Sequence, residues 1–138
     1  MAFAGINYWA IIAAAVASFM FGGAWYGILS RQWMDAVEKT KAQIDSSGMA
    51  VPMVIAFVSQ LVMAWVLAGV IGHLGKDQVT LRNGVISAGF VWLGFVLTTL
   101  ATNHGFQGAK RSLTLIDGAH WLGVLAIQGA VIGWLGVK

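Results

Sequence analysis

The sequence predicts an all-α fold, an integral membrane bundle of four transmembrane helices. Hydrophobic residues make up 59% of the 138 residues and charged residues only 9%, which is too little charge to cover a soluble domain of this size. The mean hydropathy is +0.80. Four long segments are almost free of Asp, Glu, Lys and Arg, and each exceeds the roughly 20 residues that a transmembrane helix needs.

We place the four spans at residues 7–29, 51–72, 84–103 and 113–136, within a single domain over residues 1–138. The first span has no basic residue before it, and its apolar run continues to Leu29, so we interpret it as a membrane helix and not as a cleaved signal peptide. Pro52 suits the first turn of a helix, because its missing N–H would lack an intrahelical partner there. The second span is therefore expected to begin near Val51.

The connection between the first two spans is also expected to be helical. Met34, Val37, Lys41 and Ile44 recur at helical spacing. The first helix should therefore continue beyond the membrane or turn along its surface, and end near residues 46–48.

The basic residues of the loops predict the orientation. Positively charged residues are enriched in cytoplasmic loops, and five lie in the first and third connections against three on the other side. We therefore place the first and third loops in the cytoplasm and both termini outside. The five are Arg31, Lys39, Lys41, Lys110 and Arg111, and the three are Lys76, Arg82 and Lys138.

Composition and motifs exclude several function classes. The absence of cysteine excludes disulfides, thiolate catalysis and cysteine-ligated metals. The net charge of +3 comes from short loops and predicts a topology signal, so the lipid bilayer and not a nucleic acid is the expected partner. No nucleophile motif, phosphate loop or dinucleotide fingerprint is present. We expect no enzyme activity, no cofactor and no bound metal.

Small residues predict where helices approach closely. In lipid, small side chains and occasional polar contacts decide which helix faces pack together. Three pairs with small-xxx-small spacing are Gly23 with Gly27, Gly84 with Ala88, and Gly129 with Gly133.

Trp65 and Trp92 lie near mid-span, where an indole N–H needs a partner inside the protein.

A polar stripe follows one face of the fourth span. On a helical wheel the stripe covers an arc of roughly 120°, and such a face should point towards protein or water. Gln60 of the second span is expected at a depth similar to that of His120, and Ser18 of the first span lies on another inward face. The stripe consists of Thr114, Asp117, His120, Val124 and Gln128.

Asp117 is shallower than His120, near the ends of the first and third spans, so further polar residues should converge on it. Three interpretations follow. In the first, Asp117 pairs with His120 or a basic residue (Arg31, Lys110 or Arg111), Asn103 caps the third span, and the cluster locks the third loop against the bundle. In the second, Asp117 and His120 exchange protons or bind a cationic or polar ligand. The polar residues expected to converge on Asp117 are Thr102, Asn103, His104, Lys110 and Arg111.

The third interpretation is a metal site built from His104, Asp117 and His120. Three ligands are the minimum for a catalytic zinc site. Asp-x-x-His without a positioned base is a weak motif, so the metal interpretation ranks last.

Two segments resemble a known family. GGAWYGILSRQWM at 22–34 and TNHGFQGAKRSLTLIDGAHWLGVLAIQGAVIGWLG at 102–136 resemble domain-of-unknown-function family 1761, a group of small bacterial four-span membrane proteins. The chain has Ile28 where the family usually has proline. The resemblance implies an inner-membrane protein without an assigned activity. The matching positions are Gly22, Trp25, Tyr26, Gly27, Trp33, Asn103, Phe106 and Asp117.

These observations predict a non-enzymatic membrane protein that acts through helix association, as a homo-oligomer or as an accessory subunit of a larger membrane complex. The alternative is a small transporter or channel that uses the polar stripe, with Asp117, His120 and Gln128 as its central residues. The candidate polar cluster or ligand site comprises Asp117, His120, Asn103, His104, Gln60, Trp25 and Tyr26.

Overall fold

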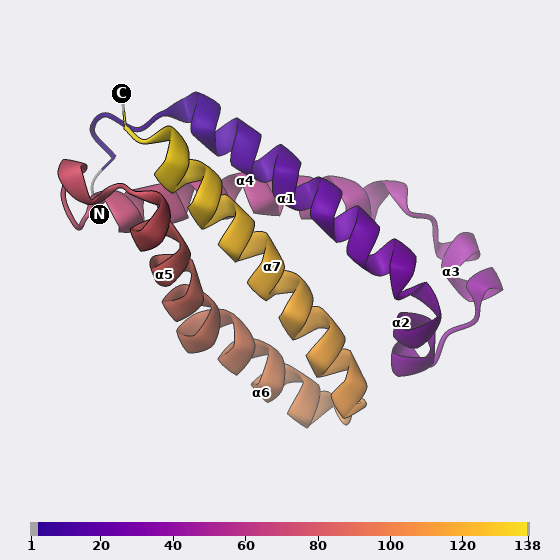
Figure 1. Ribbon diagram of the computed structural model, residues 1–138. Helices are drawn as coiled ribbons and strands as arrows, with labels where there is room; N and C mark the ends of the chain where they lie inside the picture. Colours follow the sequence, from indigo (N-terminus) through magenta and orange to yellow (C-terminus); the bar gives the residue numbers. More distant parts are fainter. Residues whose placement is uncertain (1–2, 138) are drawn as a thin grey trace.

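The computed structural model describes residues 3–137 (Figure 1). These residues form helices joined by short connections, with no strand among them. Both ends of the described chain lie at the same end of the bundle (Figure 1). The elements are α1 (Tyr8–Ile28), α2 (Ser30–Val37), α3 (Lys41–Ser47), α4 (Ala50–Gly72), a 3₁₀ turn (Lys76–Gln78), α5 (Leu81–Val91), the π-helical segment η2 (Trp92–Leu97), α6 (Thr98–Gln107) and α7 (Arg111–Leu135).

Four helices are long and apolar enough to cross a membrane, which confirms the predicted fold class. They are Tyr8–Ile28, Ala50–Gly72, Leu81–Gln107 and Arg111–Leu135. The third is longer than expected at both ends, because Thr80 caps its start and Gly108, with a φ of 66°, ends it. This third span is α5, η2 and α6 in sequence, so its middle is wound more widely than an α-helix.

The connection between the first two spans is helical, as predicted. Leu29 separates α1 from α2, and Glu38 ends α2 in a left-handed conformation with a φ of 57°. Thr40 and Gln43 then form a capping box that starts α3. The helix ends at Ser47 with Gly48 as its cap, within the range expected from the sequence.

Glycines set the closest helix crossing, between α5 and α7. A Cβ on Gly84 would collide with the backbone carbonyl of Gly129, and a Cβ on Gly129 would collide with that of Gly84. Gly133 lies equally close to the carbonyl of Thr80. The predicted close crossings of the third and fourth spans are thus confirmed. Gly23 and Gly27 differ, since no atom of another element lies within 4 Å of a Cβ built on either.

The bundle has two unlike halves. Near the termini the four spans converge, whereas at the opposite end α4 and α6 diverge from each other (Figure 1). We call residues 8–18, 60–72, 81–91 and 124–135 the closed half, and residues 19–59 and 92–123 the open half. The buried apolar cluster lies almost wholly in the closed half: Ile6, Ile11, Ala14, Ala64, Leu67, Ala68, Ile71, Ala88, Leu125 and Ile132.

Candidate functional site

The polar residues of the spans form two separate groups along α7. The first, here called the central triad, joins Ser18 of α1, Gln60 of α4 and Gln128 of α7. The second, here called the membrane-face cluster, lies in the open half between the end of α1, α6 and the first turns of α7. It contains Trp25, Tyr26, His104, Thr114, Asp117 and His120.

In the central triad, each of the three residues is hydrogen-bonded to the other two, so the triad joins three helices. Ser18 Oγ donates to Gln60 Oε1 over 2.6 Å. Gln128 Nε2 donates to Ser18 Oγ over 3.1 Å and to the backbone carbonyl of Gln60 over 3.0 Å. Because polar groups inside a bilayer must find partners within the protein, these bonds fix the register of α1, α4 and α7.

The triad is buried, with exposed fractions of 0% for Ser18, 2% for Gln60 and 0% for Gln128. One acceptor remains open, since Gln128 Oε1 has no hydrogen-bond partner among residues 3–137. A buried amide oxygen in that state is a place where a small polar molecule gains a hydrogen bond.

Gln60 does not lie at the depth expected from the sequence. It contacts Gln128, which is eight residues and about 12 Å further along α7 than His120. The helix α4 runs at an angle to α7 and diverges from it in the open half (Figure 1), so equal residue counts do not give equal depths. Ser18 was expected on an inward face, but its place at the centre of the triad depends on the rotation of α1, which one sequence does not reveal.

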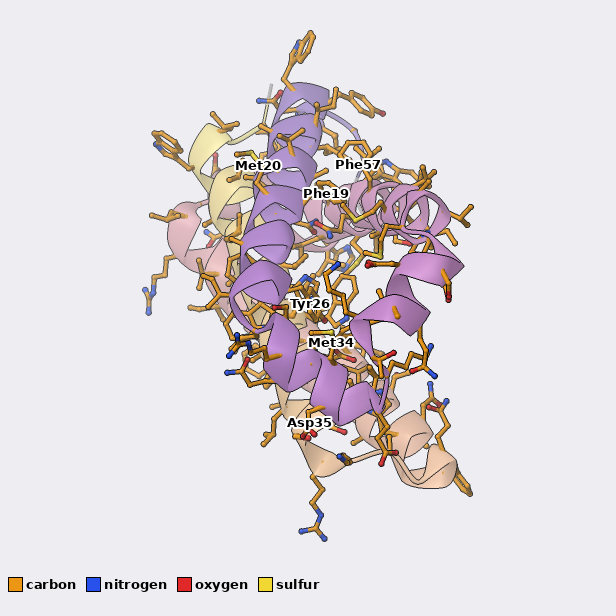
Figure 2. All side chains as sticks on the ribbon, turned by 90° about the vertical axis from the view of Figure 1, so that its right-hand side faces the viewer. Phe19, Met20, Tyr26, Met34, Asp35 and Phe57 are labelled. Atoms are coloured by element: carbon orange, nitrogen blue, oxygen red, sulfur yellow. The ribbon has the colours of Figure 1, made fainter. Side chains whose placement is uncertain are left out.

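Two consecutive residues of α1 bind the first turns of α7. Tyr26 donates its hydroxyl to Asp117 Oδ1 over 2.7 Å, and Trp25 donates its indole N–H to the carbonyl of Ile116 over 3.1 Å. Tyr26 points from α1 into the space behind α2 (Figure 2). The partners expected from the sequence are therefore not found, because Asp117 binds a tyrosine hydroxyl and neither His120 nor a basic side chain.

His120 is 4% exposed and surrounded by aromatic rings. Its ring centroid lies 4.7 Å from those of Tyr26 and Trp121 and 6.2 Å from that of Phe21, which is nearly parallel to it. Its Nδ1 atom has no hydrogen-bond partner within the part of the chain that the structure describes. Gly22 makes the site possible, because a Cβ there would lie 2.7 Å from His120 Nε2.

The third span meets α7 through two polar contacts. His104 Nδ1 lies 2.8 Å from Thr114 Oγ1, and the indole N–H of Trp92 donates to the carbonyl of Gly118 over 2.8 Å. Trp92, predicted to need a partner inside the protein, thus has one. Trp65 instead stacks on Phe3 at 4.8 Å.

Asn103 does not cap the third span as expected. It is exposed, and α6 continues to Gln107, where Gly108 provides the cap. Glycine adopts this left-handed conformation without the steric penalty of a side chain, so it terminates the helix in place of asparagine. Asn103 makes no side-chain hydrogen bond to residues 3–137 and stands apart from the cluster.

Lys110 holds the third loop against α2. Its Nζ donates to the backbone carbonyl of Asp35 over 3.0 Å and lies 3.8 Å and 3.9 Å from the carboxylates of Asp35 and Glu38. Asp35 lies at the tip of α2 (Figure 2). Lys110 was predicted as a possible partner of Asp117, whereas its partners in the structure are Asp35 and Glu38.

The geometry does not support the metal interpretation. His104 contacts Thr114, Asp117 contacts Tyr26, and His120 lies among aromatic rings. Across residues 3–137 no three His, Cys, Asp or Glu side chains are grouped so that they could hold a metal ion.

The fold and these two clusters define a small multi-pass integral membrane protein whose polar residues connect its spans. The model of a family described as "Protein of unknown function (DUF1761)" matches residues 9–133, and the chain belongs to this family. The resemblance found in the sequence is thereby confirmed. Neither the curated proteins nor the solved structures include a match.

Proposed function

We propose that this protein is a non-enzymatic membrane protein that acts through helix association, first of all as a homo-oligomer. One observation carries the proposal. Each span has a most apolar stretch, and the buried share of that stretch differs between spans. It is 39% in the fourth span but only 11% in the third. One face of the third span packs against α7, and its outer face is free to contact lipid or another protein.

The outer surface of the third span combines protruding and recessed positions. Phe90 and Phe95 are 72% and 73% exposed, and beside them no atom lies within 4 Å of a Cβ built on Gly89 or Gly94. Small residues let helix backbones approach in lipid, and large ones fill the gap opposite. A surface with both kinds of position is suited to a twofold interface, in which each chain offers the same patch.

The same surface suits the second form of the proposal, an accessory subunit of a larger membrane complex. Gly23 and Gly27 support this form, because they lie one turn apart on α1 with nothing packed against them. We further propose the bacterial inner membrane as the location, with the first and third loops in the cytoplasm. The excess of basic residues in those loops supports this orientation.

Two measurements on the full chain test the proposal. Native mass spectrometry in a mild detergent should find two or more copies, or a copy with a distinct protein. Chemical cross-linking in the membrane before extraction should give the same stoichiometry. A strictly monomeric protein without a co-purifying chain in both measurements would refute association.

A second candidate function is transport by the polar stripe of α7. His120 Nδ1 and Gln128 Oε1 favour it, because both are buried polar atoms without a partner among residues 3–137 and lie on the same inward face. The apolar core beyond the triad would have to open during transport, so this candidate is a gated carrier and not an open pore. Flux or pH-gradient assays of Asp117→Asn and His120→Ala test it, and transport unchanged in both variants would exclude the stripe.

A further inference from the structure

A groove lies between α6 and α7 at the end of the open half. Its volume is about 490 Å³, and it is open to the outside. Both walls come from membrane-spanning helices, and the third loop closes one end. The lining residues are Ala101, His104, Gly105, Ala109, Arg111, Thr114 and Leu115.

The groove is polar at one end and apolar at the other. Arg111 is the first residue of α7, and His104 and Thr114 are joined by their hydrogen bond beside it. Ala101 lies six residues inside the end of α6, or about 9 Å deeper in the membrane. A matching ligand has a polar head at the membrane surface and an apolar tail directed inward.

The charge of the groove selects an anion. No acidic residue lines it. Lys110 is engaged by Asp35 and Glu38, whereas Arg111 forms no ion pair with residues 3–137. A guanidinium without a carboxylate partner favours phosphate, which it contacts through two parallel N–H groups.

We propose that this groove binds an anionic phospholipid, with its phosphate at Arg111 and an acyl chain along Ala101 and Leu115. Basic pockets between transmembrane helices at a membrane face bind such headgroups. The apolar wall distinguishes a lipid from free phosphate, which would leave that part of the groove unfilled. The inference does not depend on the oligomeric state.

Lipid retention measures this binding. The protein is placed in bilayers that contain phosphatidylglycerol and phosphatidylcholine with identical acyl chains, and the lipids that remain bound are counted by native mass spectrometry. The natural chain should retain phosphatidylglycerol preferentially. Arg111→Gln should lower that preference about fivefold, as expected when one basic residue near the surface is lost.

Two matched variants control for general loss of charge. Arg31→Gln removes an exposed arginine from α2, and Arg82→Gln removes one from the other end of the bundle, and both should retain the preference. Gly105→Leu should fill the groove and lower the retention of both lipids, because space is open beside Gly105. Thermal unfolding should be unchanged in Arg111→Gln, since this side chain is exposed.

The outcomes separate the alternatives. Equal retention of the two lipids by the natural chain would mean ordinary boundary lipid and would overturn the proposal, as would an equal loss of preference in all three arginine variants. Displacement of the lipid by millimolar inorganic phosphate would show that the ligand is free phosphate. Selective loss in Arg111→Gln, with no effect of phosphate, would establish the lipid site.

Discussion

The closed half and the open half of this bundle are held together by different means. In the closed half, Gly84, Gly129 and Gly133 bring backbones into contact, and apolar side chains fill the remaining space. In the open half, α6 has no buried residue, and α7 meets its neighbours through single hydrogen bonds and through the aromatic rings of α1 around His120. Close packing of all four spans therefore holds one half, whereas a few hydrogen bonds and the aromatic rings around His120 position the other.

The difference matters because the bilayer gives helices no hydrophobic reason to associate. Van der Waals packing and interhelical hydrogen bonds have to supply the attraction instead. The closed half has both within one chain. The open half exposes much of its apolar surface, which lipid, a second copy or another subunit can cover.

The largest effect is expected from Gly129→Leu. The added side chain would collide with the carbonyl of Gly84, so α5 and α7 would have to separate, at a cost of about 3 kcal/mol or more. Thermal unfolding in detergent, followed by size-exclusion chromatography, measures the loss. Gly94→Leu is the matched control, with open space around it and little expected change in monomer stability. Equal stability of both variants would contradict the close crossing of α5 and α7 in the closed half.

Gln128→Leu should have the next largest effect. It removes both hydrogen bonds that the Gln128 amide donates in the central triad. The expected loss in the free energy of unfolding is about 1 to 2 kcal/mol, because each such bond contributes roughly 0.6 kcal/mol and at most about 1.7 kcal/mol. Gln107→Leu, at the exposed end of α6, controls for the change in side-chain type. A triad without structural importance would give the same unfolding temperature for both.

Tyr26→Phe should cost about 0.6 kcal/mol, since it removes only the hydrogen bond to Asp117. Tyr8→Phe, at an exposed position, is the control. Combining Tyr26→Phe with Asp117→Ala should cost less than the sum of the two single changes, because both remove the same contact. Strict additivity would show that the hydroxyl and the carboxylate do not interact.

Asp117→Asn should lower stability more than activity, and a fully stable variant without function would favour the ligand-site interpretation.

Lys110→Ala should have the smallest effect, below about 0.5 kcal/mol, because its hydrogen bond to the Asp35 carbonyl is exposed and its ion pairs with α2 are exposed and longer than 3.5 Å. The small loss should disappear at high salt, where exposed charges are screened. A loss above about 1 kcal/mol that persists in high salt would show that the loop is held more firmly than this geometry indicates.

The sequence was sufficient for the features that depend on local pattern. Runs of uncharged residues predicted the four spans, and the spacing of Gly84, Ala88, Gly129 and Gly133 predicted the close crossing. Helical spacing also predicted a helical connection between the first two spans, which the structure forms as the two helices α2 and α3. These features follow from length, periodicity and side-chain size, each of which can be counted along one chain.

Features that depend on helix rotation and tilt were not predictable in the same way. Gly23 and Gly27 have the same spacing as the packed pairs but remain uncovered. Asp117 was predicted to pair with His120 or a basic residue, whereas the rotation of α1 brings Tyr26 to it. The tilt of α4 moves Gln60 to Gln128, and the π-helical turn at Trp92–Leu97 has no clear signal in the sequence.

Disulfide cross-linking of single-cysteine variants in native membranes tests the central claim most directly, and the chain has no cysteine of its own to interfere. The claim is that the outer face of the third span is an association surface between two copies of the chain. Gly94→Cys should form disulfide-linked dimers on mild oxidation, while Ile12→Cys, at an exposed position of α1 in the closed half, should stay monomeric. No dimer at Gly94, or equal dimer formation at both positions, would contradict it.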